Sequence, residues 1–122
     1  MFSSLIFLDD ERNQTDVTWL DYSRYNGFFL VTVRSTREVR DFVVQNITDF
    51  KNTVFSLDHD LQEFDETGEQ TGYTFVRWLV EYMVDNGYNL DDLNVIVHSK
   101  NPIGKQNIEK YVENAKKFYG EL

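Results

Sequence analysis

The sequence predicts a single α/β domain, a three-layer sandwich built around a parallel sheet of about four strands. Short apolar runs alternate along the chain with segments whose apolar residues recur at helical spacing. Such runs are typical of strands that are buried on both faces, as the strands of parallel sheets are. Strands that alternate with helices are joined by right-handed crossovers, which place the helices against the sheet.

Four segments are expected to form the strands: 4–8, 28–33, 53–57 and 94–97. In the first, third and fourth of these the apolar residues are almost uninterrupted, and a polar cluster follows each run directly. The second is entered from Asn26-Gly27, a dipeptide that marks a turn.

Two helices are expected on either side of the second strand. The first is a short helix over 16–22, with Thr15 or Asp16 as its N-cap. The second begins at Ser35, because Ser35 and Glu38 have the spacing of a capping box. The apolar residues behind this box fall on one helical face: Val39, Phe42, Val43 and Ile47.

Two further helices are expected after the third and fourth strands. Thr71 opens the first and Gly87 ends it, with an apolar face made of Phe75, Trp78, Leu79, Tyr82 and Met83. Asn101 caps the last helix, because Pro102 suits the first helical position. This helix is expected to dock through Ile108, Tyr111, Val112, Ala115 and Phe118.

The acidic segment 62–70 is expected to be a solvated surface loop, the alternative being a mobile cover for the site.

Composition narrows the functional classes. The 122 residues correspond to one domain, 1–122, and 41% of them are hydrophobic, which suffices for a packed core. A net charge of −9 disfavours nonspecific binding to nucleic acid, because the phosphate backbone would be repelled. The absence of cysteine excludes disulfides, thiolate catalysis and Cys-ligated zinc. No apolar stretch could span a membrane and no basic region precedes the first apolar run, so we expect a cytoplasmic protein.

Three polar clusters are expected to meet at one edge of the sheet. They follow three different strands, and ligands of open α/β sheets bind where the carboxyl ends of the strands lie. The clusters are Asp9-Asp10-Glu11-Arg12, Asp58-His59-Asp60 and His98-Ser99-Lys100-Asn101. The sequence therefore predicts a shared pocket that holds several carboxylates and both histidines of the chain.

Two histidines at one sheet edge suggest acid and base catalysis. His59 and His98 follow the third and fourth predicted strands, which would bring the two rings close together if these strands are neighbours in the sheet. Imidazole titrates near neutral pH. This pair would suit the opening or hydrolysis of a phosphodiester, one ring activating water or a hydroxyl and the other protonating the leaving oxygen. Asp60 would orient His59 or add a ligand, and it is otherwise a loop residue. The alternative for each histidine is a structural hydrogen bond at its strand end.

The motifs resemble those of the cyclic-phosphate processing receiver domain, a divergent branch of the response-regulator receivers. The resemblance spans nearly the whole chain and is carried by Leu8-Asp9-Asp10-Glu11-Arg12, Leu57-Asp58-His59-Asp60-Leu61, Thr71-Gly72-Tyr73 and His98-Ser99-Lys100-Asn101-Pro102. It implies a receiver-like, flavodoxin-like sheet of strand order 2-1-3-4. The chain departs from ordinary receivers because no fifth strand is expected, and Lys105, in the first turn of the last helix, does not match their phosphoryl-binding lysine.

The resemblance also implies a ligand set. Asp9, Asp10 and Asp58 resemble the receiver pocket that holds a divalent cation. The resemblance implies Mg²⁺ or Mn²⁺, which prefer oxygen ligands. The alternative for Asp9 and Asp10 is a plain surface turn. Arg12 would grip phosphate or neutralise the two aspartates. Ser99 would contact a phosphoryl oxygen or form a turn, and Asn101 caps a helix start whose amides can bind an anion.

We therefore expect a phosphoesterase-like enzyme that opens or hydrolyses cyclic phosphates. The resemblance points to nucleotide or RNA-end 2′,3′-cyclic phosphates, or to related ADP-ribose cyclic phosphates, and so to a small phosphorylated ligand or RNA end as partner. The alternative is a non-catalytic receiver-fold module that binds a nucleotide or a protein, such as an accessory protein of a phage. Phosphotransfer to Asp58 is disfavoured because the receiver lysine is missing.

Overall fold

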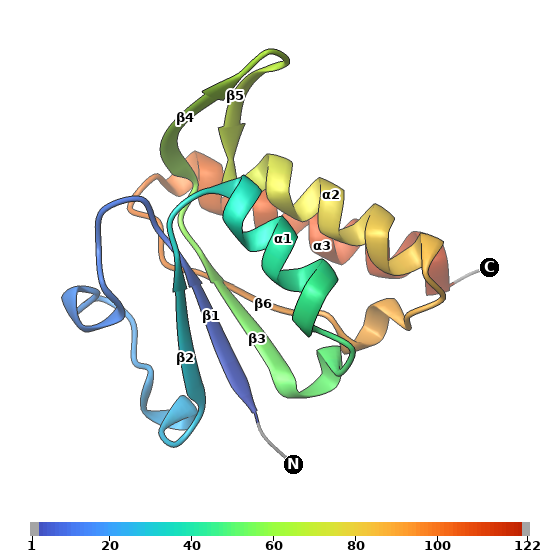
Figure 1. Ribbon diagram of the computed structural model, residues 1–122, viewed down its shortest axis with the longest axis horizontal. Helices are drawn as coiled ribbons and strands as arrows, with labels where there is room; N and C mark the ends of the chain where they lie inside the picture. The colour runs from blue at the N-terminus through green and yellow to red at the C-terminus, as the bar shows by residue number, and fades with distance from the viewer. Residues whose placement is uncertain (1–2, 121–122) are drawn as a thin grey trace.

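A parallel sheet of four strands forms the centre of the protein, whose computed structural model describes residues 3–120 (Figure 1). Its strands are β1 (Ser4–Leu8), β2 (Phe29–Val33), β3 (Thr53–Leu57) and β6 (Asn94–Val97). They lie in the order β2-β1-β3-β6, and all three pairings are parallel. The predicted fold class and the predicted order of the four sheet strands are confirmed, β6 being the fourth.

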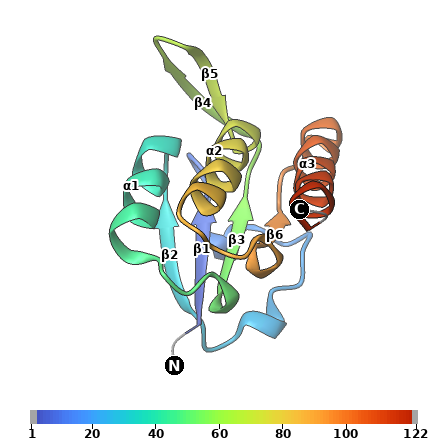
Figure 2. The same cartoon turned by 90° about the vertical axis from the view of Figure 1, so that its right-hand side faces the viewer.

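Three α-helices cover one face of this sheet (Figures 1 and 2). They are α1 (Thr36–Asn46), α2 (Gly72–Asp85) and α3 (Pro102–Gly120). Each begins at the predicted cap, because the side chains of Ser35, Thr71 and Asn101 accept hydrogen bonds from backbone amides of the first turn. The capping residues satisfy amides that have no partner within the helix. Local sequence signals therefore fixed where the helices start.

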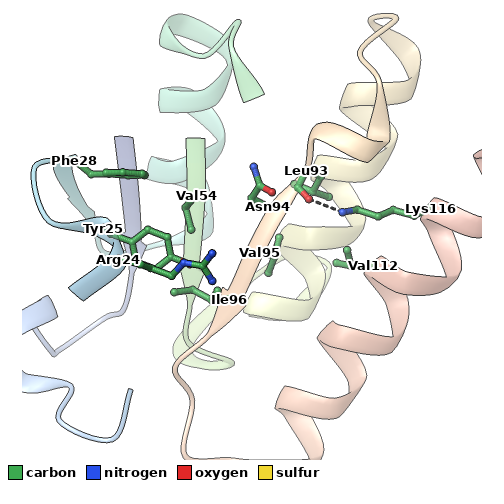
Figure 3. A pocket seen from close by; sticks show the side chains of 10 residues that line it. All are labelled: Arg24, Tyr25, Phe28, Val54, Leu93, Asn94, Val95, Ile96, Val112 and Lys116. Carbon is green, nitrogen blue, oxygen red and sulfur yellow. Dashed lines mark hydrogen bonds between the residues drawn. The ribbon is translucent and has the colours of Figure 1, made fainter. Parts of the chain in front are cut away.

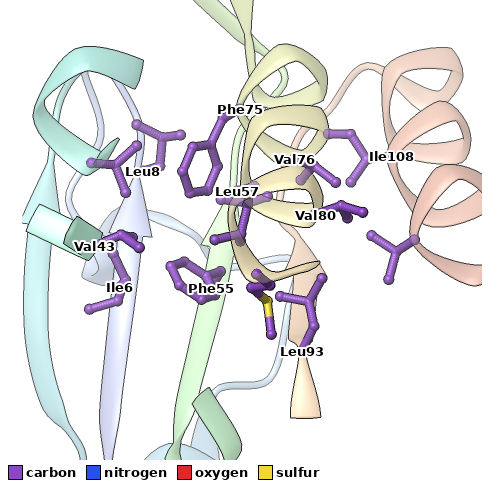
Figure 4. Packing of buried hydrophobic residues seen from close by; sticks show 14 of the residues in the cluster. Ile6, Leu8, Val43, Phe55, Leu57, Phe75, Val76, Val80, Leu93 and Ile108 are labelled. Atoms are coloured by element: carbon purple, nitrogen blue, oxygen red, sulfur yellow. The ribbon is translucent and has the colours of Figure 1, made fainter. Parts of the chain in front are cut away.

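The main hydrophobic core lies between these helices and the sheet (Figure 4). Alternate residues of the central strands point into it, among them Ile6, Leu8, Phe55 and Leu57. The predicted helix faces supply the other side, except that Phe118 is 60% exposed and does not dock. Phe118 lies in the last turn of α3.

The opposite face of the sheet is covered by residues 13–28, which we call the strap. The helix expected over 16–22 is absent, and the strap instead holds two short 3₁₀ turns, Gln14–Asp16 and Ser23–Tyr25. Thr15, Val17 and Thr18 are β-branched and weaken a helix, while the Asp16 carboxylate accepts a hydrogen bond from the backbone amide of Asn13. The third layer of the sandwich is therefore an irregular segment.

An antiparallel hairpin projects from the end of β3 (Figures 1 and 2). It consists of β4 (Asp60–Asp65) and β5 (Gly68–Thr71), so the prediction of an irregular loop over 62–70 was wrong. Backbone pairing and the buried Leu61 hold the hairpin, and the chain leaves its tip at Gly68, whose φ of 121° favours glycine. The Glu63 carboxylate ties it to the start of α1 by accepting hydrogen bonds from the Thr36 amide and hydroxyl.

Two further 3₁₀ turns, Phe50–Asn52 and Leu90–Asp92, precede β3 and β6. Within residues 3–120, no helix combines the length and the apolar character that crossing a bilayer requires.

Gly72 lets α2 approach the end of β3. A Cβ atom at this position would lie 2.0 Å from the carbonyl oxygen of Asp58, and the Gly72 amide donates a hydrogen bond to the carbonyl of His59. The backbone of the Asp58 loop therefore packs directly on the first turn of α2.

We expect Gly72→Ala to lower the free energy of unfolding by about 1–3 kcal/mol, because backbone must move to admit the methyl group. Urea denaturation measures this change. Gly120→Ala is the matched control, since a Cβ there meets no atom within 4 Å, and it should leave stability unchanged or slightly raised. Equal stability of Gly72→Ala and the unchanged protein would contradict this account of the packing.

Candidate functional site

Three carboxylates converge where the central strands β1 and β3 end. Asp9, Asp10 and Asp58 each offer an oxygen atom, and these atoms lie within 4.8 Å of one another. The Asp58 amide donates to the carbonyl of Leu8, which continues the β1–β3 ladder and aligns the two loops. The carboxylates border a pocket of about 170 Å³ that is lined by Asp9, Asp10, Glu11, Arg12, Asp58, Asp60, Gln62, Ser99, Lys100 and Asn101.

Asp9 is almost fully buried and heavily hydrogen-bonded. Its Oδ1 accepts from the backbone amides of Glu11 and Arg12, and its Oδ2 lies 3.1 Å from His98 Nε2. Burial opposes the charge, but the hydrogen bonds outweigh burial and lower the pKa of Asp9. Asp9 is therefore an ionised carboxylate at neutral pH.

The other two carboxylates of the cluster are shifted in the opposite direction. Burial, followed by the nearby charge of Asp9, raises the pKa of Asp58 to about 6. Burial also raises the pKa of Asp10, and the charges of Glu11 and Asp9 add to this shift. Clustered carboxylates repel one another, so the pocket favours an added positive charge.

His98 is fully buried and holds Asp9 in place. Its ring stacks on Phe7 with a centroid distance of 4.3 Å, and its Nδ1 lies 2.8 Å from the Ser56 hydroxyl. Burial lowers the pKa of His98, so the neutral ring donates through Nε2 to Asp9 and accepts from Ser56 through Nδ1. The hydroxyl of Tyr22 continues this chain to Ser56 from the strap.

His59 lies in a different environment. Its Nδ1 is 2.9 Å from Asp60 Oδ1, and the hydrogen bond to His59 is the main cause of the lowered pKa of Asp60. The ring packs against α3 at Gly104, where a Cβ atom would lie 2.4 Å from His59 Cγ. Asn101 Nδ2 donates to the second oxygen of Asp60 and completes the contact between this loop and α3.

The expected pair of accessible imidazoles is therefore not formed. Neither histidine is among the described residues that line the pocket, and both ring nitrogens of His98 are hydrogen-bonded in the interior. His59 keeps a side-chain exposure of 18%. The predicted convergence of the carboxylates is confirmed, whereas the orientation of His98 could not be read from its position after a strand.

The three residues expected to contact phosphate all border the pocket. Arg12 Nη1 lies 3.5 Å from Asp9 Oδ2 and 3.8 Å from Asp58 Oδ2. The Ser99 hydroxyl accepts from the Asn101 amide and hydrogen-bonds Asp58. Asn101 caps α3, so its structural alternative is the one observed, and the start of the helix still faces the site.

Two residues that the sequence does not mark build the site from the strap and from the turn after β2. The Trp19 indole donates to the carbonyl of His98, and the Arg34 guanidinium donates to the carbonyls of Asp9 and Arg12. No motif marks either residue, because each acts through contacts that only the tertiary fold creates. Lys100 also borders the pocket, although no motif predicts a role for it.

A larger groove, of about 470 Å³, runs along the outer edge of β6 (Figure 3). Arg24 and Tyr25 of the strap lie on one side of it, and Lys116 of α3 lies on the other, donating to the carbonyl of Leu93. No described lining residue is acidic or a histidine. The smaller pocket is therefore the one equipped for chemistry.

Two solved structures are similar to this chain. It resembles the Legionella pneumophila response regulator LqsR at 15% identity and a TM-score of 0.46, covering 98% of this chain and 46% of LqsR. It also resembles the signal receiver domain of a putative Luxo repressor protein from Vibrio parahaemolyticus at 14% identity and a TM-score of 0.43, covering 96% and 92% of the two chains. No curated protein matches.

A family model matches most of the chain. The model of the cyclic-phosphate processing receiver domain matches residues 4–114, which include the carboxylate cluster, the hairpin and the start of α3. The match covers all four strands of the parallel sheet. The chain therefore belongs to the cyclic-phosphate processing receiver domain family.

Proposed function

We propose that this protein binds Mg²⁺ or Mn²⁺ at Asp9, Asp10 and Asp58 and opens or hydrolyses a cyclic phosphate in the adjoining pocket. The observation that carries the proposal is the convergence of three carboxylate oxygens within 4.8 Å at the ends of two adjacent central strands. Membership of a family described as cyclic-phosphate processing supports the reaction class.

The donor set fits a hard divalent cation. Carboxylate oxygens are the protein ligands that Mg²⁺ and Mn²⁺ prefer, and one or two of them with water and substrate phosphate usually suffice. The cluster already attracts the Arg12 guanidinium, a cation that contacts Asp9 and Asp58. A bound divalent cation would supply charge neutralisation and polarisation of a phosphoryl oxygen.

The chain supplies the phosphate contacts from two directions. Arg12 can present a planar fork to phosphate oxygens, and Ser99 and the start of α3 border the same pocket. These groups would orient the phosphate against the carboxylate side of the site. Orientation of this kind is a large part of catalysis in phosphoryl chemistry.

Proton transfer falls to His59, with Asp60 orienting its ring. Asp60 accepts a hydrogen bond from Nδ1, which leaves Nε2 of the partly exposed ring for a substrate. His98 takes the role of a positioning residue, because its buried ring contacts Asp9 and not the pocket. This division of roles differs from the symmetrical acid and base pair that the sequence suggested.

The expected substrates are a nucleotide or RNA-end 2′,3′-cyclic phosphate, or a related ADP-ribose cyclic phosphate. A pocket of about 170 Å³ can admit a phosphate group, while the net charge of −9 opposes the approach of long nucleic acid backbones. The rest of such a ligand would lie outside the pocket.

A second candidate function is ligand binding without turnover. The observation that favours it is the burial of His98, which leaves one partly exposed imidazole where acid and base catalysis normally uses two groups. In that case the pocket would hold a nucleotide, and the protein would signal or sequester it.

Asp58→Asn should stabilise the metal-free protein at neutral pH. The folded state holds the Asp58 proton up to about pH 6, above the ordinary value of 3.8, so ionisation at higher pH favours unfolding. We expect a gain of about 1–3 kcal/mol at pH 7.5 that shrinks as the pH falls through 6 and vanishes near pH 4. Urea denaturation in EDTA measures it.

Asp41→Asn is the control, since it makes the same change of net charge at an exposed position of α1. It should alter stability by less than about 0.5 kcal/mol at any of these pH values. Added Mg²⁺ should raise the thermal midpoint of the unchanged protein and not that of Asp58→Asn. If Asp58→Asn is less stable than the unchanged protein at pH 7.5 in EDTA, the destabilising effect of the Asp58 charge is contradicted.

Turnover is tested with a panel of 2′,3′-cyclic nucleotides and an ADP-ribose cyclic phosphate, with products followed by ³¹P NMR. We expect hydrolysis with Mg²⁺ or Mn²⁺ and none in excess EDTA. His59→Asn should lower kcat about 100-fold, because general acid–base catalysis typically contributes that much or more. Absence of turnover on every compound, with metal and nucleoside monophosphate binding intact, would favour the binding module.

A further inference from the structure

Arg12 occupies the position of a counter-ion in the carboxylate cluster. Its Nη1 is 3.5 Å from an oxygen of Asp9 and 3.8 Å from an oxygen of Asp58, both of which are buried. The Arg12 side chain itself is 34% exposed, so it can move without unpacking the core. A guanidinium in this place neutralises the same two carboxylates that would ligate a divalent cation.

Trp19 of the strap gathers two cations at the rim of the pocket. The Arg12 Cζ lies 5.1 Å from the centroid of the indole ring, and the Lys100 Nζ lies 4.3 Å from it. The indole cannot turn freely, because its Nε1 donates to the carbonyl of His98 at 2.8 Å. Tryptophan is the strongest cation-binding aromatic side chain, so the ring is suited to hold both groups.

Arg12 and Lys100 are the only cationic residues among the described residues that line the pocket. Five of the other lining side chains are acidic. Without a metal ion the acidic excess repels phosphate, and Arg12 is engaged with Asp9 and Asp58. Arg12 therefore couples the binding of the metal ion to the binding of phosphate.

We propose that Arg12 is a displaceable counter-ion, which the divalent cation replaces so that Arg12 and Lys100, both resting on Trp19, form a two-cation site for the substrate phosphate. This inference rests on the proposed function and names the order of binding at that site. A guanidinium and a metal ion at the same two carboxylates repel each other, so binding of the metal favours the release of Arg12. It then remains beside the indole, where its fork is available to an anion.

Arg12→Gln should tighten the binding of Mg²⁺ and weaken the binding of phosphate. Isothermal titration with Mg²⁺ alone should show binding about 3–10-fold tighter than in the unchanged protein, because the competing cation is gone. Titration of the Mg²⁺-saturated protein with inorganic phosphate should show binding at least about tenfold weaker. Lys100→Gln should weaken phosphate binding and change Mg²⁺ affinity less than Arg12→Gln does.

Arg24→Gln is the matched control, because Arg24 lies over Tyr25 and lines the groove at β6, not this pocket. It removes the same charge and should change both affinities less than about twofold. Circular dichroism checks that each variant folds. If Arg12→Gln is unfolded, Trp19→Leu serves instead, since loosening Arg12 should tighten Mg²⁺ binding and weaken phosphate binding.

The outcomes separate this inference from the proposed function. Weaker or unchanged Mg²⁺ binding by the folded Arg12 or Trp19 variant, in a protein that binds Mg²⁺ when unchanged, overturns the counter-ion role. Unchanged phosphate binding by the Mg²⁺-saturated variants overturns the two-cation site. Failure of the unchanged protein to bind Mg²⁺ overturns the proposed function, and the inference with it.

Discussion

The buried charge of Asp9 is the constraint on which the site depends. A carboxylate at the end of a central strand, with 1% of its surface exposed, must have its charge and its hydrogen-bonding capacity satisfied by the protein. Two backbone amides, the His98 ring and Arg12 together do so. Because these partners come from two different strand ends, the requirements of one side chain fix the loop after β1 relative to the end of β6.

The same requirement shapes the layer that has no helix. His98 points to the face of the sheet that the strap covers. The Tyr22 hydroxyl is linked to the His98 ring through the Ser56 hydroxyl, and the Trp19 indole donates to the His98 carbonyl. Hydrogen bonds in such a buried network are strong only if every member has a partner, and no described buried side-chain polar atom here lacks one. A polar network, and not an apolar helix face, therefore attaches the strap at this end of the sheet.

The sequence predicted those parts of the molecule that have local or topological causes. Capping residues such as Ser35 and Thr71 act within one turn, and the carboxyl ends of parallel strands always share an edge, so Asp9 and Asp58 had to meet. The orientation of His98 depends instead on what covers the second face, where the sequence predicts a helix over 16–22 and the strap holds only short 3₁₀ turns. The sequence does not predict the hairpin at 60–71, because most of its residues are exposed and backbone pairing needs no apolar pattern.

The irregular strap has a consequence for how the molecule fluctuates. Much of it is exposed, Val17 being its one fully buried apolar side chain among those described, and its 3₁₀ turns are short. Segments with few apolar contacts open more readily than core strands, so the strap is expected to be the first cooperative unit to detach under native conditions. Backbone amides there would exchange with solvent ahead of those in β1 and β3. Each such opening would remove the indole and the Tyr22 hydroxyl from the polar end of the sheet while leaving the helical core assembled.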